Sequence, residues 1–171
     1  ITDCSGLCGG NSILDECGVC NSGFTAATVE LYLCGCGTGG YGNEGIVLIS
    51  PTGYNECYFN ESVPNWLNYE CDNTFLSNFG SGGGIVAGLF SNFINNQINI
   101  NSQHFSSELI AENTLRIETL YTGYDANNAV IAVSNYSQPT SLFTLNGEYT
   151  ESVNFSGADN VFIPDCIQAC N

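Results

Sequence analysis

Short runs of β-type sequence, separated by turn residues, fill most of the chain after residue 23. In residues 114–121, Leu115, Ile117, Thr119 and Tyr121 alternate with Arg116, Glu118 and Leu120. This period of two predicts a strand with one buried face. Asn146-Gly147 stands between two β-type runs and predicts a tight hairpin turn. The predicted strands are 28–34, 45–50, 56–59, 96–101, 114–121, 129–134, the two runs around Asn146-Gly147, and 159–164.

Strands at this spacing, without a convincing amphipathic helix, predict an all-β fold, an immunoglobulin-like or jelly-roll-like β-sandwich. Residues 84–94 (GIVAGLFSNFI) fit either a short helix or a buried strand. Residues 1–23 are rich in Cys, Gly and Asn and hold few large apolar groups, so they cannot fold by burial alone. We therefore predict a cysteine-rich connector arm over 1–23 and a sandwich domain over 24–171.

Residues 73–107 contain no Asp, Glu, Lys or Arg. One interpretation is a buried central strand with Asn-rich loops. The other is a strand edge left unprotected because another subunit pairs with it, since natural sheets usually guard exposed edges with charges or proline.

The charge balance narrows the choice of partners. Seventeen acids face a single basic residue, Arg116, giving a formal net charge of −16. Binding to nucleic acid or to anionic lipid needs several basic side chains, so neither is expected. No apolar run reaches the roughly 20 residues of a membrane helix, and membrane insertion is not expected either. The partners that the charge balance still allows are neutral glycans, divalent cations and copies of the chain itself.

Ten cysteines, an even number, predict up to five disulfides and a secreted protein. The chain has no methionine, which indicates a processed product or a piece of a longer protein. On a strand Cys34 and Cys36 point the same way, so we expect them to pair with Cys57 and Cys71 rather than with each other. In the arm, thiolate coordination of zinc is the minor alternative to disulfides. The cysteines are Cys4, Cys8, Cys17, Cys20, Cys34, Cys36, Cys57, Cys71, Cys166 and Cys170.

The arm reads DCSGLCGG followed by DECGVCNSG over residues 3–23. It resembles the D-C-x-G-x-C-G-G … D-x-C-G-V-C-x-G motif of large secreted and cell-surface proteins. The resemblance implies a disulfide-stapled connector between modules, sometimes near calcium-binding acidic repeats. Asp3, Asp15 and Glu16 are the weak calcium candidates here, because the D-x-D-x-D-G ladders of such repeats are missing. No other cofactor is predicted.

The C-terminal PDCIQACN repeats the D-C-x3-C spacing of the arm at Cys166 and Cys170. It is interpreted either as a local staple or as one end of a head-to-tail array of copies, as an open heterologous assembly requires.

No residue is predicted to be catalytic. His104 is the single histidine, expected on the surface or in a turn, and no nucleophile elbow accompanies it. GCGTGG (35–40) precedes a strand, not the helix of a dinucleotide site. Four acids near Trp66 are interpreted as solvated loop acids, with a glycoside hydrolase as the remote alternative; they are Glu56, Glu61, Glu70 and Asp72.

Three N-x-S/T sequons make Asn60, Asn135 and Asn154 candidate glycosylation sites. The preferred hypothesis is a non-enzymatic structural subunit of an extracellular or cell-surface filament, fibre or layer, which polymerises through its arm and its unprotected strand edges. The alternative is a carbohydrate-binding or adhesin module of a larger secreted protein, with Trp66 as a contact for glycans by stacking.

Overall fold

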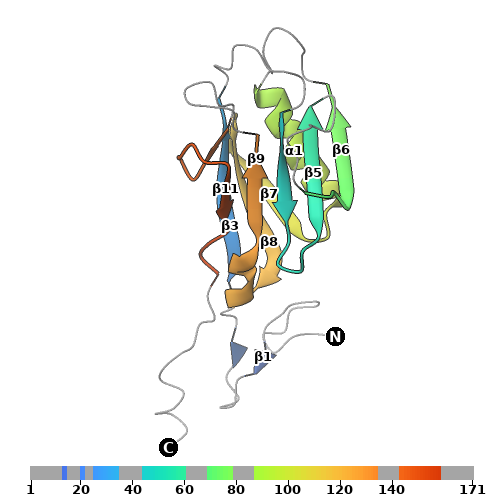
Figure 1. The fold of residues 1–171 in the computed structure, drawn as a ribbon. Coiled ribbons are helices and arrows are strands. Elements are labelled where there is room, and N and C mark those ends of the chain that lie inside the picture. The colour runs from blue at the N-terminus through green and yellow to red at the C-terminus, as the bar shows by residue number, and fades with distance from the viewer. Residues whose placement is uncertain are drawn as a thin grey trace, which may run out of the picture.

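A computed structural model of the chain describes residues 13–14, 20–21, 25–34, 44–60, 69–78, 87–134 and 143–158. Two β-sheets pack face to face, with one α-helix beside them (Figure 1). The elements are β1 (Ile13–Leu14), β2 (Cys20–Asn21), β3 (Ala26–Leu33), β4 (Gly45–Ile49), β5 (Asn55–Asn60), β6 (Asn73–Ser77), α1 (Ala87–Asn101), β7 (Phe105–Ala111), β8 (Thr114–Thr122), the 3-10 helix η1 (Tyr124–Asn128), β9 (Val130–Val133), β10 (Phe143–Leu145) and β11 (Ser152–Asn154). The predicted all-β sandwich is confirmed.

One sheet has the strand order β10-β3-β8-β7, and all its neighbours are antiparallel. Its strands alternate as the sequence predicts. In β8, Leu115 and Ile117 are fully buried, whereas Arg116 and Glu118 are exposed. Arg116 lies between Glu30 of β3 and Glu108 of β7, 3.2 and 3.1 Å from their carboxylates. These exposed ion pairs contribute at most about 1 kcal/mol each.

The second sheet has the order β11-β9-β4-β5-β6, with β5 and β6 parallel and the other pairs antiparallel. Its central strands are buried on both faces. Ile46 and Tyr58 belong to the main core between the sheets, whereas Val47 and Phe59 belong to a smaller cluster on the outer face. Gly45 permits the close contact of β4 with β5, because a Cβ there would clash with the Phe59 ring and the Tyr58 carbonyl.

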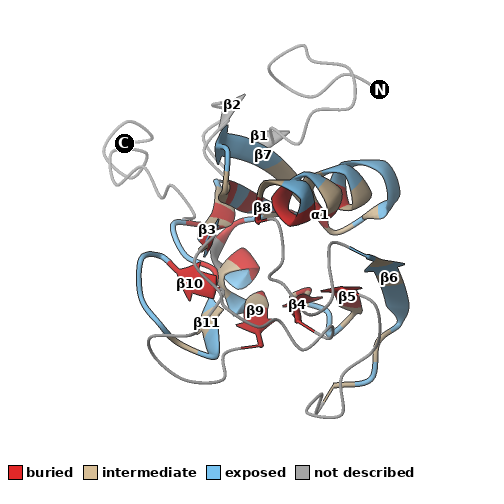
Figure 2. Ribbon diagram, turned by 90° about the horizontal axis from the view of Figure 1, so that it is seen from above, coloured by how far each residue is buried: buried red, intermediate tan, exposed pale blue. Residues whose placement is uncertain are grey.

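Helix α1 closes one side of the core. It buries Phe90, Ile94 and Ile98, spaced four residues apart, against the strands (Figure 2). The predicted strand over 96–101 is therefore wrong, because those residues form the last turns of α1. The helical alternative is correct for 87–94.

The Asn146-Gly147 turn is confirmed. Both residues have positive φ, 51° and 82°, and Leu145 and Glu148 exchange two backbone hydrogen bonds across them, as in a type I′ turn. The hairpin is short, because the chain then leaves for β11, which pairs with β9 in the other sheet. The predicted strand 159–164 lies outside the described residues. Within the arm, β1 and β2 form an antiparallel pair.

Candidate functional site

The strand β6 forms one edge of the five-stranded sheet, and its residues Asn73–Ser77 include no charged residue and no proline. Thr74 and Leu76 are exposed, Leu76 to 49%. Within the described part of the chain, the backbone of β6 pairs only with β5. One side of this strand therefore has no backbone partner among the residues that the structure describes.

The edge of the other sheet at β7 is covered by α1. The Asn99 side chain accepts a hydrogen bond from the Ser107 N–H (3.0 Å) and donates one to the Ser107 carbonyl (2.8 Å). The Ser91 hydroxyl donates to the Glu112 carbonyl (2.9 Å). A side-chain amide thus takes the place of a neighbouring strand at β7, and β7 also carries the charge of Glu108. Both are known means of protecting a sheet edge.

The described parts of the uncharged segment 73–107 are residues 73–78 and 87–107, which include β6 and α1. β6 and α1 occupy the same side in Figures 1 and 2. On α1, Leu89 is 55% and Ile100 is 76% exposed, and no charged residue occurs along the helix. The first interpretation of this segment, a buried central strand, is wrong, because its strands are the edge strand β6 and the start of the edge strand β7.

A buried carboxylate lies at one end of the core. Glu56 on β5 is 2% exposed and faces inward beside Tyr58. Its oxygens accept hydrogen bonds from the Tyr58 hydroxyl (2.7 Å) and from the Ser102 hydroxyl (2.9 Å). The prediction of a solvated loop acid is wrong for Glu56, whose neighbours in the sequence form a strand buried on both faces.

Burial, and then the charge of Glu56 and the hydrogen bond to it, raise the pKa of Tyr58 well above its ordinary value of 10.0. The Ser102 hydroxyl also accepts hydrogen bonds from the backbone N–H groups of His104 and Phe105 (3.1 and 2.9 Å). Through its bond to Glu56, Ser102 therefore links β5 to the turn between α1 and β7. Sequence reasoning missed Ser102, although a serine after a helix often bonds to nearby backbone.

His104 lies in that turn, where a turn residue was predicted. Its Nδ1 is 2.8 Å from the Tyr121 hydroxyl, and its ring centre is 4.6 Å from that of Tyr54. All three rings are partly buried. Among the described residues, the His104 ring contacts only the rings and hydroxyl of Tyr54 and Tyr121, and the hydrogen bond to Ser102 comes from its backbone N–H; its side chain is therefore a packed aromatic group.

The other predicted acids have separate environments. Asp72 accepts the Asn55 N–H (2.8 Å), and the Glu70 carbonyl accepts the Asn55 amide (2.8 Å). Glu61 and Trp66 lie outside the described residues, as do the calcium candidates Asp3, Asp15 and Glu16. Among the residues that the structure does describe, no three His, Cys, Asp or Glu side chains gather as a metal site would require.

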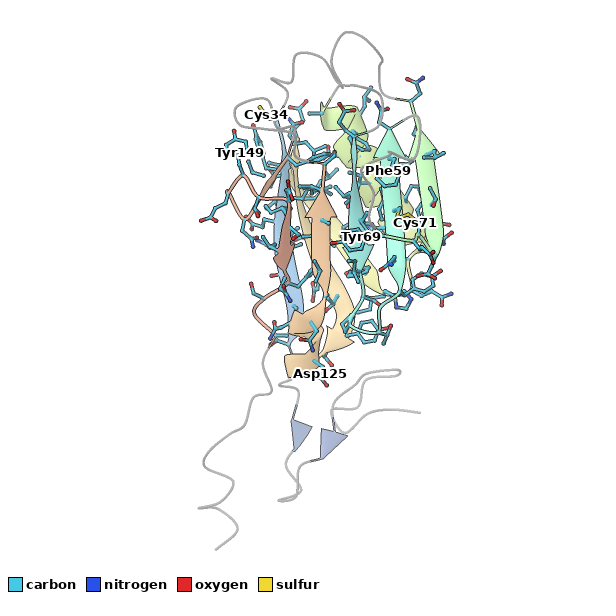
Figure 3. All side chains as sticks on the ribbon, in the orientation of Figure 1. Cys34, Phe59, Tyr69, Cys71, Asp125 and Tyr149 are labelled. Carbon is cyan, nitrogen blue, oxygen red and sulfur yellow. A yellow bond between two sulfur atoms is a disulfide. The ribbon has the colours of Figure 1, made fainter. Side chains whose placement is uncertain are left out.

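Cys57 and Cys71 form a disulfide, with their Cα atoms 5.8 Å apart. The predicted pairing of Cys34 and Cys36 with these two cysteines is therefore wrong. Cys34 is also in a disulfide. Cys20 lies in β2, and the other cysteines lie outside the described residues. The Cys57–Cys71 bond joins β5 to the residues just before β6 (Figure 3).

The three sequons differ in access. The Asn60 side chain is fully buried at the end of β5, which leaves no space for a glycan on the folded domain. Asn154 on β11 is exposed, with a 3.3 Å hydrogen bond to the Asn127 carbonyl. Asn135 lies outside the described residues.

Comparison with known proteins finds no family model that matches the chain, no similar curated protein and no similar solved structure. Among the described residues, no helix has both the length and the apolar character needed to cross a bilayer.

Proposed function

We propose that this protein is a non-enzymatic structural subunit of an extracellular filament, fibre or surface layer. Its copies cohere by strand addition at the β6 edge, and the arm 1–23 acts as a disulfide-stapled connector to the next copy in a head-to-tail polymer. The open, uncharged β6 edge is the observation that carries this proposal.

Strand addition suits this edge because main-chain hydrogen bonds supply the binding and side-chain pockets supply the selectivity. The contrast with β7 is informative. In its described part, the chain covers the β7 edge with Asn99, whereas the outer edge of β6 has no backbone partner there. An exposed edge without charge or proline is a hazard for a protein that must stay dispersed, and it is useful to a protein that must assemble.

The charge of the molecule supports the same choice of surface. At −16, two copies repel one another wherever their carboxylates approach. Neither β6 nor α1 carries an acidic residue, and the exposed Leu76, Leu89 and Ile100 on these two elements add apolar area. The Cys57–Cys71 disulfide fits an oxidising, extracellular setting.

The test is sedimentation velocity, with electron microscopy, of the full chain and two matched variants. Leu76→Lys places a charge on the β6 edge. Leu120→Lys makes the same change at a leucine of nearly equal exposure, 51% against 49%, on the outer face of the other sheet. We expect the parent and Leu120→Lys to form regular assemblies and Leu76→Lys to remain dispersed.

A parent protein that sediments only as an 18.2 kDa monomer under all conditions would remove the structural-subunit proposal. Equal loss of assembly in both lysine variants would show that net charge, and not the β6 edge, decides the outcome.

A further inference from the structure

The β6 strand is complementary to itself. If two copies of Asn73–Ser77 pair antiparallel about Phe75, Thr74 stands opposite Leu76, and Asn73 opposite Ser77. The same register places Asp72 opposite Asn78, so no carboxylate meets another. Side chains directly opposite in an antiparallel pair lie about 4.5–5.5 Å apart, and like charges there are destabilising.

Other segments of the chain fit the β6 edge less well. β7 carries Glu108 at its centre, and its own edge is already bonded by Asn99. β11 has only three residues and follows Glu151 directly. The arm brings Asp3, Asp15 and Glu16. For an edge that contains no cation, another β6 is less repulsive than any of these segments, and its five residues offer a longer pairing than the three of the uncharged edge strand β10.

The β6 edge is also held in place before it binds. Phe75 faces the core and stacks on Tyr58, with ring centres 5.0 Å apart. The Cys57–Cys71 disulfide fixes the chain just before the strand. Thr74 and Leu76 project on the outer face, level with Cys57 and Phe59 of β5. A strand held in this way loses little further freedom on pairing, which favours association.

We infer that the β6 edge binds the β6 edge of a second copy in antiparallel register centred on Phe75, joining two five-stranded sheets into one. This inference rests on the proposed function and names the partner at its site. The contact is isologous, so it joins two copies head to head. Extension beyond the pair, and any head-to-tail order, then depends on the cysteine-rich arm.

A charge exchange across the pair tests the register. One variant of the full chain carries Thr74→Lys with Leu76→Lys, and the other carries Thr74→Glu with Leu76→Glu. In the inferred register, each variant alone places like charges opposite one another twice. A mixture of the two places opposite charges there. Both positions are exposed, and circular dichroism of each variant checks that the fold is kept.

The readout is the dissociation constant of the pair by sedimentation at one fixed ionic strength. We expect each variant alone to associate about tenfold or more weakly than the parent. The equimolar mixture should recover most of the lost affinity. Recovery would be absent if β6 received a different segment, because that segment would be the same in both variants.

The outcomes separate this inference from the proposed function. A parent that assembles, with variants that weaken but do not rescue one another, overturns the β6–β6 pairing and leaves the structural subunit standing. A parent that never assembles overturns both. Variants that assemble as well as the parent exclude β6 from the contact.

Discussion

At the residue scale, the most consequential side chains in the core are polar. Glu56 is buried without a cation among its described partners and is satisfied by two hydroxyl groups, from Tyr58 and Ser102. Charged groups are rarely buried in this way unless hydrogen bonds replace the lost water. Ser102 also anchors two backbone N–H groups, so one small side chain orders the whole turn after α1.

Ser102→Ala should lower the free energy of unfolding by about 2–3 kcal/mol, because it removes a donor to a buried carboxylate and an acceptor for two N–H groups. Urea unfolding followed by circular dichroism measures this loss. Ser152→Ala, on the exposed strand β11, is the matched control and should stay within about 0.5 kcal/mol of the parent. Equal stabilities of the two variants would contradict this account of the cluster.

The Tyr58 phenol makes the stability depend on alkaline pH. Its pKa is raised in the folded protein above the ordinary 10.0, mainly by burial. Above pH 10 the unfolded chain therefore loses a proton that the folded chain keeps. The free energy of unfolding should then fall with pH, and Tyr58 accounts for up to about 1.4 kcal/mol per pH unit of that fall.

Unfolding of the parent and of Tyr58→Phe between pH 9 and pH 11.5 tests this dependence. The phenylalanine variant is less stable at every pH, since Glu56 loses a donor, but its stability should decline less steeply above pH 10. Parallel declines in the two proteins would show that Tyr58 does not titrate differently on unfolding.

At the element scale, two glycines give the same substitution opposite effects. Gly147→Ala should cost about 1–2 kcal/mol of unfolding free energy, because Gly147 has φ 82° in the Asn146-Gly147 turn. Gly88→Ala should be neutral or stabilise by up to about 1 kcal/mol, because Gly88 is helical and a Cβ there meets its nearest atom at 3.4 Å. Urea unfolding of both variants measures these changes in the free energy of unfolding. A destabilising Gly88→Ala or a harmless Gly147→Ala would contradict the backbone assignment.

The sequence predicted the elements whose burial alternates cleanly, such as β3 and β8, and the turn at Asn146-Gly147. The strand predicted over residues 96–101 is wrong, because Ile98 and Ile100 are spaced two residues apart, as on one face of a strand. In the structure, Ile98 is buried on the same face of α1 as Ile94, one helical turn earlier, and Ile100 is exposed. Only tertiary packing decides which of the two periods is used.

The candidate site was only partly predictable. The missing charges of residues 73–107 indicated an unprotected edge as one of two interpretations. The sequence could not place β6 at the end of a sheet, because strand order depends on contacts distant in the chain. Nor could it show that Asn99 covers β7, since an asparagine on a helix carries no signal of the strand that it meets.

At the scale of the whole molecule, the chain combines a net charge of −16 with two uncharged elements in its described part, the edge strand β6 and the helix α1. Repulsion of this kind restricts how copies meet, and it weakens as salt screens the charges. The disulfide between Cys57 and Cys71 closes a separation of 14 residues and stabilises the domain by roughly 3 kcal/mol in the chain-entropy account. In the proposed assembly, the disulfide-linked sandwich is the durable unit and the β6 edge is its contact with the next copy.

Hydrogen exchange of the backbone amides, compared between assembled and dispersed material, tests the central claim most directly. We predict that amides within Asn73–Ser77 become protected on assembly, whereas those of Ser152–Asn154, at the opposite edge of the same sheet, do not change. Unchanged exchange in Asn73–Ser77, in material that is assembled, would contradict the claim that β6 is the edge through which copies cohere.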